Sequence, residues 1–212
     1  MEKKLTEKEI MENISEKDEL RFEGSEAYDF YPKILKRISL SREEKILDVG
    51  CGIGRLSRYL KGFNLYGCDV TEKFVKQARK EFYKEVKLAD IYALPYKDKE
   101  FDKIICLGVF EYLEYPEKAM KELFRVCKGD IILNTPNYNS AGILNFLSNN
   151  WSNFIDSIVE DGTRWTNKDF HKDIAKNCKL KLKIKYFSRK FESIRNIWGN
   201  LFAGDIIGIY SQ

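Results

Sequence analysis

A short apolar run that ends in three alternating glycines is the feature that most limits how this chain can fold. Ile46-Leu47-Asp48-Val49 leads directly into Gly50-Cys51-Gly52-Ile53-Gly54, and helical spacing resumes from Leu56 to Leu60. Such a run, bounded by glycines, is typical of a buried strand followed by a tight turn. Glycines in that turn tolerate positive φ and let a ligand lie against bare backbone near the start of the next helix. The segment therefore predicts a strand, a turn that is a candidate binding site, and a helix.

Strand and helix patterns alternate along the rest of the chain. Further strands are predicted at residues 64–68, 86–89, 103–107, 130–134, 180–187 and 205–211, and helices at residues 27–38, 72–82, 117–126 and 167–178. Strands that alternate with helices of this length imply parallel strands joined by right-handed crossovers. We therefore expect an α/β fold with helices on both faces of one sheet.

Acidic residues close the second and third predicted strands. Asp69 comes nineteen residues after Gly50, where a carboxylate can accept hydrogen bonds from both hydroxyls of a ribose. Asp90 ends the third strand, where it can accept a hydrogen bond from an adenine amino group while Ile91 packs on the ring. Each acid alone also fits a helix cap or a turn. Together at strand ends, where open parallel sheets bind ligands, they favour a site for a nucleotide-like molecule.

Two common nucleotide motifs are absent from the glycine turn. A dinucleotide fingerprint would need a glycine at the position of Arg55, and the Gly-Lys-Ser/Thr of a P-loop is missing. The turn therefore indicates neither a dinucleotide site of that type nor a P-loop nucleotide triphosphatase.

The set of motifs resembles the class I S-adenosylmethionine-dependent methyltransferases, especially the small-molecule group often called type 11. The resemblance runs from about residue 28 to 137. Its motifs are Ile46-Leu47-Asp48-Val49-Gly50-Cys51-Gly52-Ile53-Gly54, Gly67-Cys68-Asp69-Val70-Thr71, Ala89-Asp90-Ile91 with Leu94-Pro95, and Phe101-Asp102-Lys103-Ile104-Ile105 leading to Phe110-Glu111-Tyr112-Leu113. The resemblance implies a Rossmann-like, seven-stranded, mostly parallel sheet whose last strand, residues 205–211, is antiparallel. It also implies S-adenosylmethionine as the cofactor, S-adenosylhomocysteine as the product, and no metal.

The resemblance further implies where the cofactor would bind. Its contacts would be Gly50 and Gly52 at the methionine portion, Asp69 at the ribose, Asp90 and Ile91 at the adenine, and Leu107 beside the sulfonium, with Cys51 and Val70 as further cofactor contacts. Asp48 belongs to the same set and would act mainly by organising the glycine turn.

Methyl transfer is an in-line displacement in which placement and exclusion of water matter more than a strong acid or base. Relatives often carry Glu-His after the fourth strand, whereas this chain has Glu111-Tyr112, so a histidine base is not expected there. The candidates that could line the acceptor site are Glu111, Tyr112, Asn137 and His171. For His171, within Asp169-Phe170-His171-Lys172, we expect a surface position on a helix.

Composition excludes several other function classes. The five cysteines are scattered without a Cys-x-x-Cys pair, and His171 is the only histidine, so neither a zinc site nor a disulfide scaffold is expected. Most cysteines lie among apolar neighbours, where a thiol acts as a small hydrophobe. A Ser-His-Asp or Cys-His mechanism would depend on His171 alone. No run approaches eighteen apolar residues and the first residues lack a signal-peptide core, so we expect a cytoplasmic protein without a membrane span.

Length and composition favour a single domain over residues 1–212, with residues 1–40 as a helical N-terminal extension and residues 137–165 as a lid-like insertion. Substrate choice in such folds usually lies in added segments of this kind. The aromatics of the insertion fit either a lid over a partly apolar acceptor or core anchors of a helical cap: Tyr138, Phe146, Trp151, Phe154 and Trp165. From their position alone, Arg21, Tyr28 and Tyr31 are candidates for contacting the methionine carboxylate.

Three functions remain open at this point. The first is methyl transfer to an oxygen or nitrogen atom of an unidentified small molecule. The second makes the acceptor an RNA, because residues 166–195 carry ten bases against three acids. That reading is not favoured, since the lysines alternate with apolar residues from 180 to 186, as in a strand with one solvated face. The third is a non-catalytic S-adenosylmethionine-binding sensor or partner subunit, suggested by the missing histidine.

Overall fold

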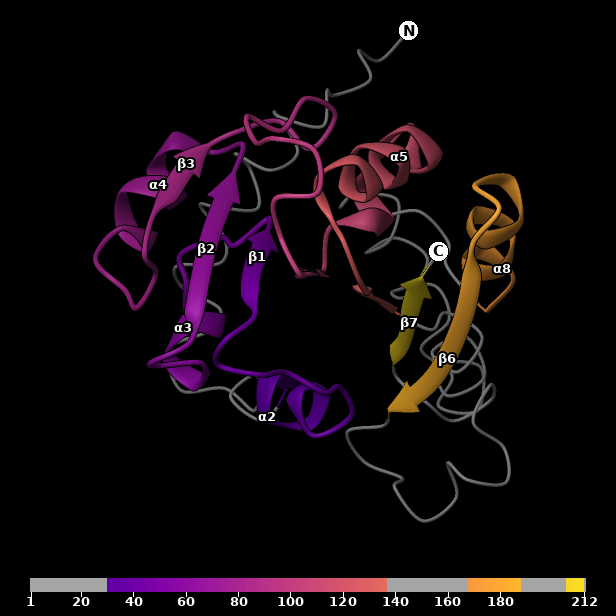
Figure 1. Cartoon of the computed structure of the whole chain (residues 1–212), viewed down its shortest axis with the longest axis horizontal. Coiled ribbons are helices and arrows are strands. Elements are labelled where there is room, and N and C mark those ends of the chain that lie inside the picture. The colour runs from indigo at the N-terminus through magenta and orange to yellow at the C-terminus, as the bar shows by residue number, and fades with distance from the viewer. Residues whose placement is uncertain (1–29, 137–167, 188–204, 212) are drawn as a thin grey trace, which may run out of the picture.

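The structure, a computed structural model, describes residues 30–136, 168–187 and 205–211. Its strands are β1 (Lys45–Val49), β2 (Asn64–Asp69), β3 (Val86–Leu88), β4 (Lys103–Leu107), β5 (Ile131–Pro136), β6 (Lys181–Phe187) and β7 (Asp205–Ser211). Its helices are α2 (Phe30–Leu35), α3 (Arg55–Tyr59), α4 (Glu72–Ala78), α5 (Pro116–Val126) and α8 (Lys168–Asn177), with a 3-10 turn, η2 (Phe110–Tyr112). Figure 1 shows these elements along the chain.

The strands form one seven-stranded sheet in the order β3-β2-β1-β4-β5-β7-β6. The pairs from β3 across to β5 are parallel, and β7 runs antiparallel to both β5 and β6. This arrangement confirms the predicted mostly parallel sheet with an antiparallel last strand. The chain builds outward from β1 to β3 and then returns to place β4 on the other side of β1, so the strand order reverses between β1 and β4. The arrowheads of β1 and β2 point to the same edge in Figure 1.

Helices cover both faces of the sheet, as predicted. On one face, Leu47 and Val49 of β1 belong to a core cluster that also contains the apolar side of α5 and of α8. On the other face, Ile46 packs in a cluster with residues of α2 and α3. The second face also holds α4, whose Val75 packs with Val86 of β3. The alternation of side chains along β1 therefore separates two apolar layers.

One helix is shorter than its pattern predicts. The spacing predicts a helix over residues 72–82, but α4 ends at Ala78. The next residues return to the sheet, where the Lys84 amide donates to the Leu65 carbonyl at 2.7 Å and the Gly67 amide donates to the Glu85 carbonyl at 2.9 Å. These bonds hold the loop before β3 against β2. The helix therefore ends before this loop, which places Tyr83 against the core on the α3 and α4 face of the sheet.

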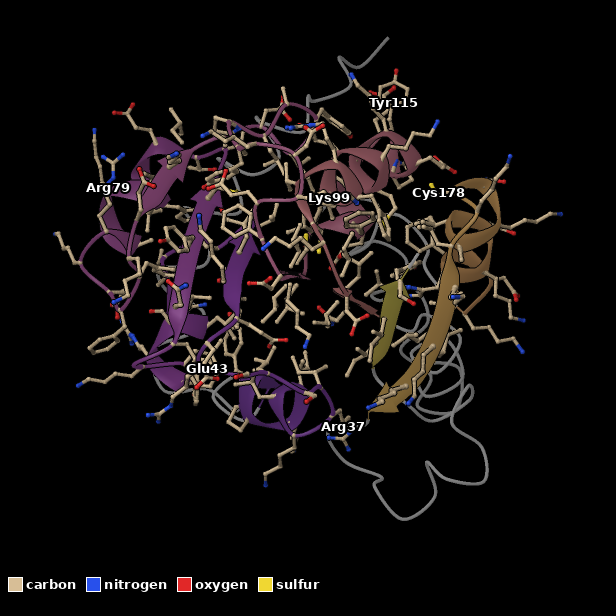
Figure 2. All side chains as sticks on the ribbon, in the orientation of Figure 1. Arg37, Glu43, Arg79, Lys99, Tyr115 and Cys178 are labelled. Carbon is tan, nitrogen blue, oxygen red and sulfur yellow. The ribbon has the colours of Figure 1, made fainter. Side chains whose placement is uncertain are left out.

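The alternating lysines of β6 have the predicted pattern. Lys181 and Lys183 are exposed, whereas Leu182 is half-buried against the core. Lys185 differs, because it is half-buried and its ammonium donates to the Arg37 carbonyl. The cysteines also behave as predicted: each is free, and four are buried. Cys178, at the end of α8, is half-buried (Figure 2).

Several expectations fall outside the described residues. These are the helices and contacts predicted before residue 30, including Arg21 and Tyr28, and the insertion at residues 137–165 with its aromatics and Asn137. Within the described ranges, no helix is long and apolar enough to cross a membrane. The same ranges contain no group of three or more His, Cys, Asp and Glu residues arranged to hold a metal ion.

Candidate functional site

The turn after β1 depends on the two glycines that follow Val49. Gly50 and Gly52 have φ of 72° and 53°, in the left-handed region that side chains disfavour. The amides of Gly50 and Cys51 both donate to the Cys68 carbonyl, at 2.9 and 3.0 Å, which fixes the turn to the end of β2. A Cβ on Gly50 would lie 2.3 Å from Val109 Cγ2, whereas a Cβ on Gly52 would meet no atom of the described residues within 4 Å. The turn is therefore packed on one side and open above Gly52.

Asp69 ends β2 beside this open space. Its Oδ2 accepts a hydrogen bond from the Gly52 amide at 2.9 Å, and its Oδ1 accepts one from the Thr71 amide at 2.9 Å. Burial raises the pKa of the Asp69 carboxyl, and the backbone amides oppose that shift. Asp69 is thus a buried carboxylate that backbone amides orient beside the open space above Gly52.

The end of β3 supplies the next predicted contacts. Asp90 is exposed, and its Oδ1 accepts a hydrogen bond from the Tyr92 amide at 2.9 Å, as in a turn-forming aspartate. Ile91 is buried at 9% exposure and packs in the core cluster of the α5 face. The structure therefore brings both residues to the same edge as Asp69, with the charge outward and the apolar side chain inward.

Helix α5 holds the loop that follows Asp90. Glu122 Oε1 accepts a hydrogen bond from the Leu94 amide at 2.8 Å. Arg125 donates to the carbonyls of Leu94 and Tyr96 at 2.9 and 2.8 Å, and it pairs with Glu122 at 2.7 Å. Hydrogen bonds from Arg125 hold the pKa of the Glu122 carboxyl below its usual range. This network fixes the loop against α5, a role that the sequence pattern did not reveal.

The carboxyl ends of β4 and β5 form the other side of the site. Leu107 is half-buried, and the next amide, that of Gly108, donates to Asn134 Oδ1 of β5 at 3.0 Å. Glu111 is buried at 4% exposure, and Tyr112 is half-buried beside it in η2. Asn134 lies inside β5 after three apolar residues, and it was not predicted as a site residue from the sequence.

Asp48 lies under the glycine turn, as expected from its place near the end of β1. It is 3% exposed, and its Oδ2 accepts a hydrogen bond from the Tyr83 hydroxyl at 2.6 Å. Burial raises the pKa of the Asp48 carboxyl to about 7, the Tyr83 hydrogen bond opposes that shift, and the nearby Asp69 adds to it. Tyr83 was not selected from the sequence. A signal for it exists in Gly54 and Gly67, because a Cβ on either would lie 3.1 Å from the Tyr83 ring.

The expectation that His171 lies at the surface is wrong. The side chain is fully buried between α8 and the sheet, on the α5 face. Its Nε2 lies 2.9 Å from the Thr135 hydroxyl and its Nδ1 lies 2.7 Å from the Tyr210 hydroxyl. A Cβ at Gly208 would lie 2.5 Å from Nδ1, so this glycine makes room for the ring. Both ring nitrogens are therefore used within the core, and His171 is a structural residue.

The described site consists of an open glycine turn, an oriented buried acid and an apolar wall. These elements meet where the strand order of a parallel sheet reverses, which is where doubly wound folds bind nucleotide-type cofactors. The geometry therefore defines a class of protein, one with a Rossmann-like sheet and a candidate ligand site at its carboxyl edge.

Comparison with known proteins shows which family the chain is similar to. Residues 47–133 match the family model described as a methyltransferase domain. The chain is 31% identical over 111 residues to ubiquinone biosynthesis O-methyltransferase of Thiobacillus denitrificans, covering 48% of each chain. It is 34% identical over 84 residues to "Probable tRNA methyltransferase 9B" of Mus musculus, covering 38% of this chain and 19% of that protein. The motifs described above are thus similar to those of S-adenosylmethionine-dependent methyltransferases, over a match that spans less than half of the chain.

The fold agrees with this assignment. The structure superposes on a SAM-dependent methyltransferase of Thermotoga maritima with a TM-score of 0.72 at 18% identity, covering 97% of this chain and 99% of that chain. At this identity the similarity shows a shared class I fold. The chain spans less than half the length of the curated relatives that it matches first.

Proposed function

We propose that this chain binds S-adenosylmethionine at the carboxyl edge of its sheet and transfers the methyl group to an oxygen or nitrogen atom of a small molecule. The observation that carries this proposal is the position of Asp69, oriented by two backbone amides beside the open space above Gly52. A buried carboxylate oriented in this way suits the hydroxyls of a ribose, and bare glycine backbone suits close approach by a ligand.

Each part of the cofactor has proposed partners. The methionine portion would lie against Gly50, Cys51 and Gly52, with Asp48 beneath them. The ribose would contact Asp69 and Val70, and the adenine would contact Asp90 and Ile91. The sulfonium would lie beside Leu107. The bound cofactor supplies a methyl group on a positively charged sulfur. The protein's own task is to hold the acceptor in line and to exclude water.

Glu111 and Tyr112 are the proposed acceptor-side residues within the described chain. Both lie in η2, directly after the strand that carries Leu107. The buried carboxyl of Glu111 can accept a hydrogen bond from an acceptor hydroxyl or ammonium group, and a proton relay of that kind needs a separation of about 2.6 to 3.2 Å. Asn137 keeps its place as a candidate from the sequence, whereas His171 is no longer proposed.

An RNA acceptor is the second candidate, because residues 168–187 carry seven lysines and two aspartates. Lys181 and Lys183 on β6 are exposed, as are Lys172 and Lys176 on α8. One relative is also named a probable tRNA methyltransferase. The same lysines fit an ordinary solvated face of an edge strand, and the small-molecule acceptor is therefore preferred.

An assay of methyl transfer distinguishes these functions. The purified chain is incubated with S-adenosylmethionine carrying a labelled methyl group, together with either a low-mass metabolite fraction or total RNA. Our proposal predicts S-adenosylhomocysteine formation with the metabolite fraction, label that stays in low-mass products, and loss of both in Asp69→Asn. Label recovered in RNA would favour the second candidate. Cofactor binding without product in any fraction would favour the non-catalytic sensor or partner subunit.

A further inference from the structure

The space around Tyr83 is created by glycines on two different elements. A Cβ on Gly67 of β2 would lie 3.1 Å from two atoms of the Tyr83 ring, and a Cβ on Gly54, after the turn, would lie 3.1 Å from a third. Contacts that short are tighter than side chains normally accept, so the ring favours glycine at position 67. Gly54 is favoured in addition by its φ of 89° and by Glu81 Cγ, which would lie 3.0 Å from its Cβ. Gly67 therefore keeps room under the glycine turn for the Tyr83 ring.

Among the residues that the structure describes, Asp48 is the charged group to which the Tyr83 hydroxyl donates a hydrogen bond. The distance of 2.6 Å between Tyr83 Oη and Asp48 Oδ2 is that of a strong hydrogen bond from a neutral donor to a carboxylate. Asp48 also raises the pKa of the Cys51 thiol, after burial itself, so its charge is felt within the turn. The pair thus links the loop before β3 to the backbone that faces the proposed cofactor.

We propose that Tyr83 is a positioning residue of the cofactor site, whose hydroxyl holds Asp48 in its ionised form beneath the glycine turn, where the negative charge favours the cationic cofactor over a neutral ligand. This inference rests on the proposed function, because it assigns a role toward bound S-adenosylmethionine. Tyr83 does not contact the reacting atoms in this scheme; it acts through Asp48.

The groups that surround Asp48 leave few other charges to balance it. Those that interact with it or with Tyr83 come from α2, the turn, β2 and β4: Tyr31, Cys51, Cys68, Asp69 and Cys106. Burial raises the pKa of the three thiols and of Tyr83, so these groups stay neutral near pH 7. Asp69 is the second carboxylate of the group and disfavours ionisation of Asp48. Within the described residues, the Tyr83 hydrogen bond is the interaction that opposes burial of the Asp48 charge.

A cationic ligand should therefore bind more tightly as Asp48 loses its proton. With the pKa of Asp48 at about 7, affinity for the cationic cofactor should rise about tenfold between pH 6 and pH 8. Tyr83→Phe keeps the ring and removes the hydroxyl, and a hydrogen bond to an ionised group is worth about one pKa unit or more. The variant should therefore ionise Asp48 only at higher pH. Its affinity should be weaker by close to tenfold at pH 6, by about fivefold at pH 7, and unchanged at pH 9.

The test is calorimetric titration of the folded chain with S-adenosylmethionine from pH 6 to pH 9, comparing Tyr83→Phe with wild type. Titration of the ligand itself is common to both proteins and cancels in the ratio of their Kd values. Tyr66→Phe is the matched control, because Tyr66 lies on β2 but faces the opposite core cluster, against Phe101. Its Kd ratio to wild type should stay near 1 throughout. In an Asp48→Asn background, adding Tyr83→Phe should leave the Kd unchanged at every pH.

A Kd ratio for Tyr83→Phe that falls toward 1 as the pH rises, and only when Asp48 is present, supports the inference. A ratio that is the same at every pH, or that persists in Asp48→Asn, overturns it and makes Tyr83 a packing residue. Failure of the wild type to bind the cofactor at any pH overturns the proposed function as well, so the two failures are distinguishable.

Discussion

The single histidine predicts how the stability of the folded chain changes in acid. His171 is fully buried, and its two ring nitrogens lie within hydrogen-bonding distance of the hydroxyls of Thr135 and Tyr210. A neutral imidazole can donate through one nitrogen and accept through the other, and each hydroxyl can take the matching part. A protonated ring would place a charge in this core without a counter-ion among its hydrogen-bond partners. We therefore predict that acid unfolds the chain partly through this residue.

The magnitude follows from the shifted pKa. Burial lowers the pKa of His171 from an ordinary 6.5 to about 4. Because the folded state resists protonation, the unfolded state binds more protons between these values, and stability falls as the pH drops from 6.5 to 4. One pKa unit corresponds to about 1.36 kcal/mol. Because the folded state keeps the His171 ring neutral, the free energy of unfolding should fall by about 3 kcal/mol between pH 7 and pH 4.

The assay uses the fact that the chain has one histidine. Its imidazole signals in an NMR titration need no assignment, and they should shift with a midpoint near pH 4. In parallel, denaturant unfolding of wild type and His171→Gln at pH 7 and pH 4 isolates the histidine from the carboxyl groups that also titrate. The advantage of wild type over the variant should shrink by about 3 kcal/mol at pH 4. An imidazole that titrates near pH 6.5, or an advantage that does not change with pH, would refute the buried network.

Two further substitutions test the backbone of the site. Gly50→Ala should lower the free energy of unfolding by about 2 to 5 kcal/mol and abolish cofactor binding, because it combines positive φ with a clash against Val109. The control is Gly62→Ala, where φ is 86° and no described atom lies near the added Cβ; it should lower the free energy of unfolding by only about 1 to 2 kcal/mol and leave binding intact. Thermal melts and calorimetry measure both effects. Arg125→Met should leave the Leu94 and Tyr96 carbonyls without their donor, lower the free energy of unfolding by about 1 to 3 kcal/mol, and weaken cofactor binding through the loop after β3. Unchanged binding in Gly50→Ala, or unchanged stability and binding in Arg125→Met, would contradict these assignments.

The sheet was predictable because its signals are local. Apolar runs that alternate with helical spacing favour parallel strands, and the glycines after β1 and the acid at the end of β2 mark the edge at which we propose that a ligand binds. The antiparallel β7 came only from the resemblance to a family, since periodicity does not give strand direction. The end of α4 was misplaced because helical spacing continues to Phe82, while hydrogen bonds to β2 draw the chain back to the sheet after Ala78.

The missed residues act across long separations in the sequence. Tyr83 bonds to Asp48, and Arg125 bonds to the carbonyls of Leu94 and Tyr96, contacts that only the folded chain creates. His171 was misplaced because its neighbours Asp169 and Lys172 are charged, and a single polar side chain on the inner side of a helix gives no warning of partners on β5 and β7. Hydrogen-bonded core residues of this kind require tertiary information.

The most direct test of the central claim is calorimetric titration with S-adenosylmethionine and S-adenosylhomocysteine. We expect micromolar binding by the wild type and binding weaker by about tenfold or more in Asp69→Ala, because charge-assisted hydrogen bonds to the ribose are lost. Asp173→Ala, at an exposed position on α8, should bind as the wild type does. A folded wild type that binds neither molecule, or an Asp69→Ala variant that binds both with wild-type affinity, would contradict the cofactor site proposed at this edge of the sheet.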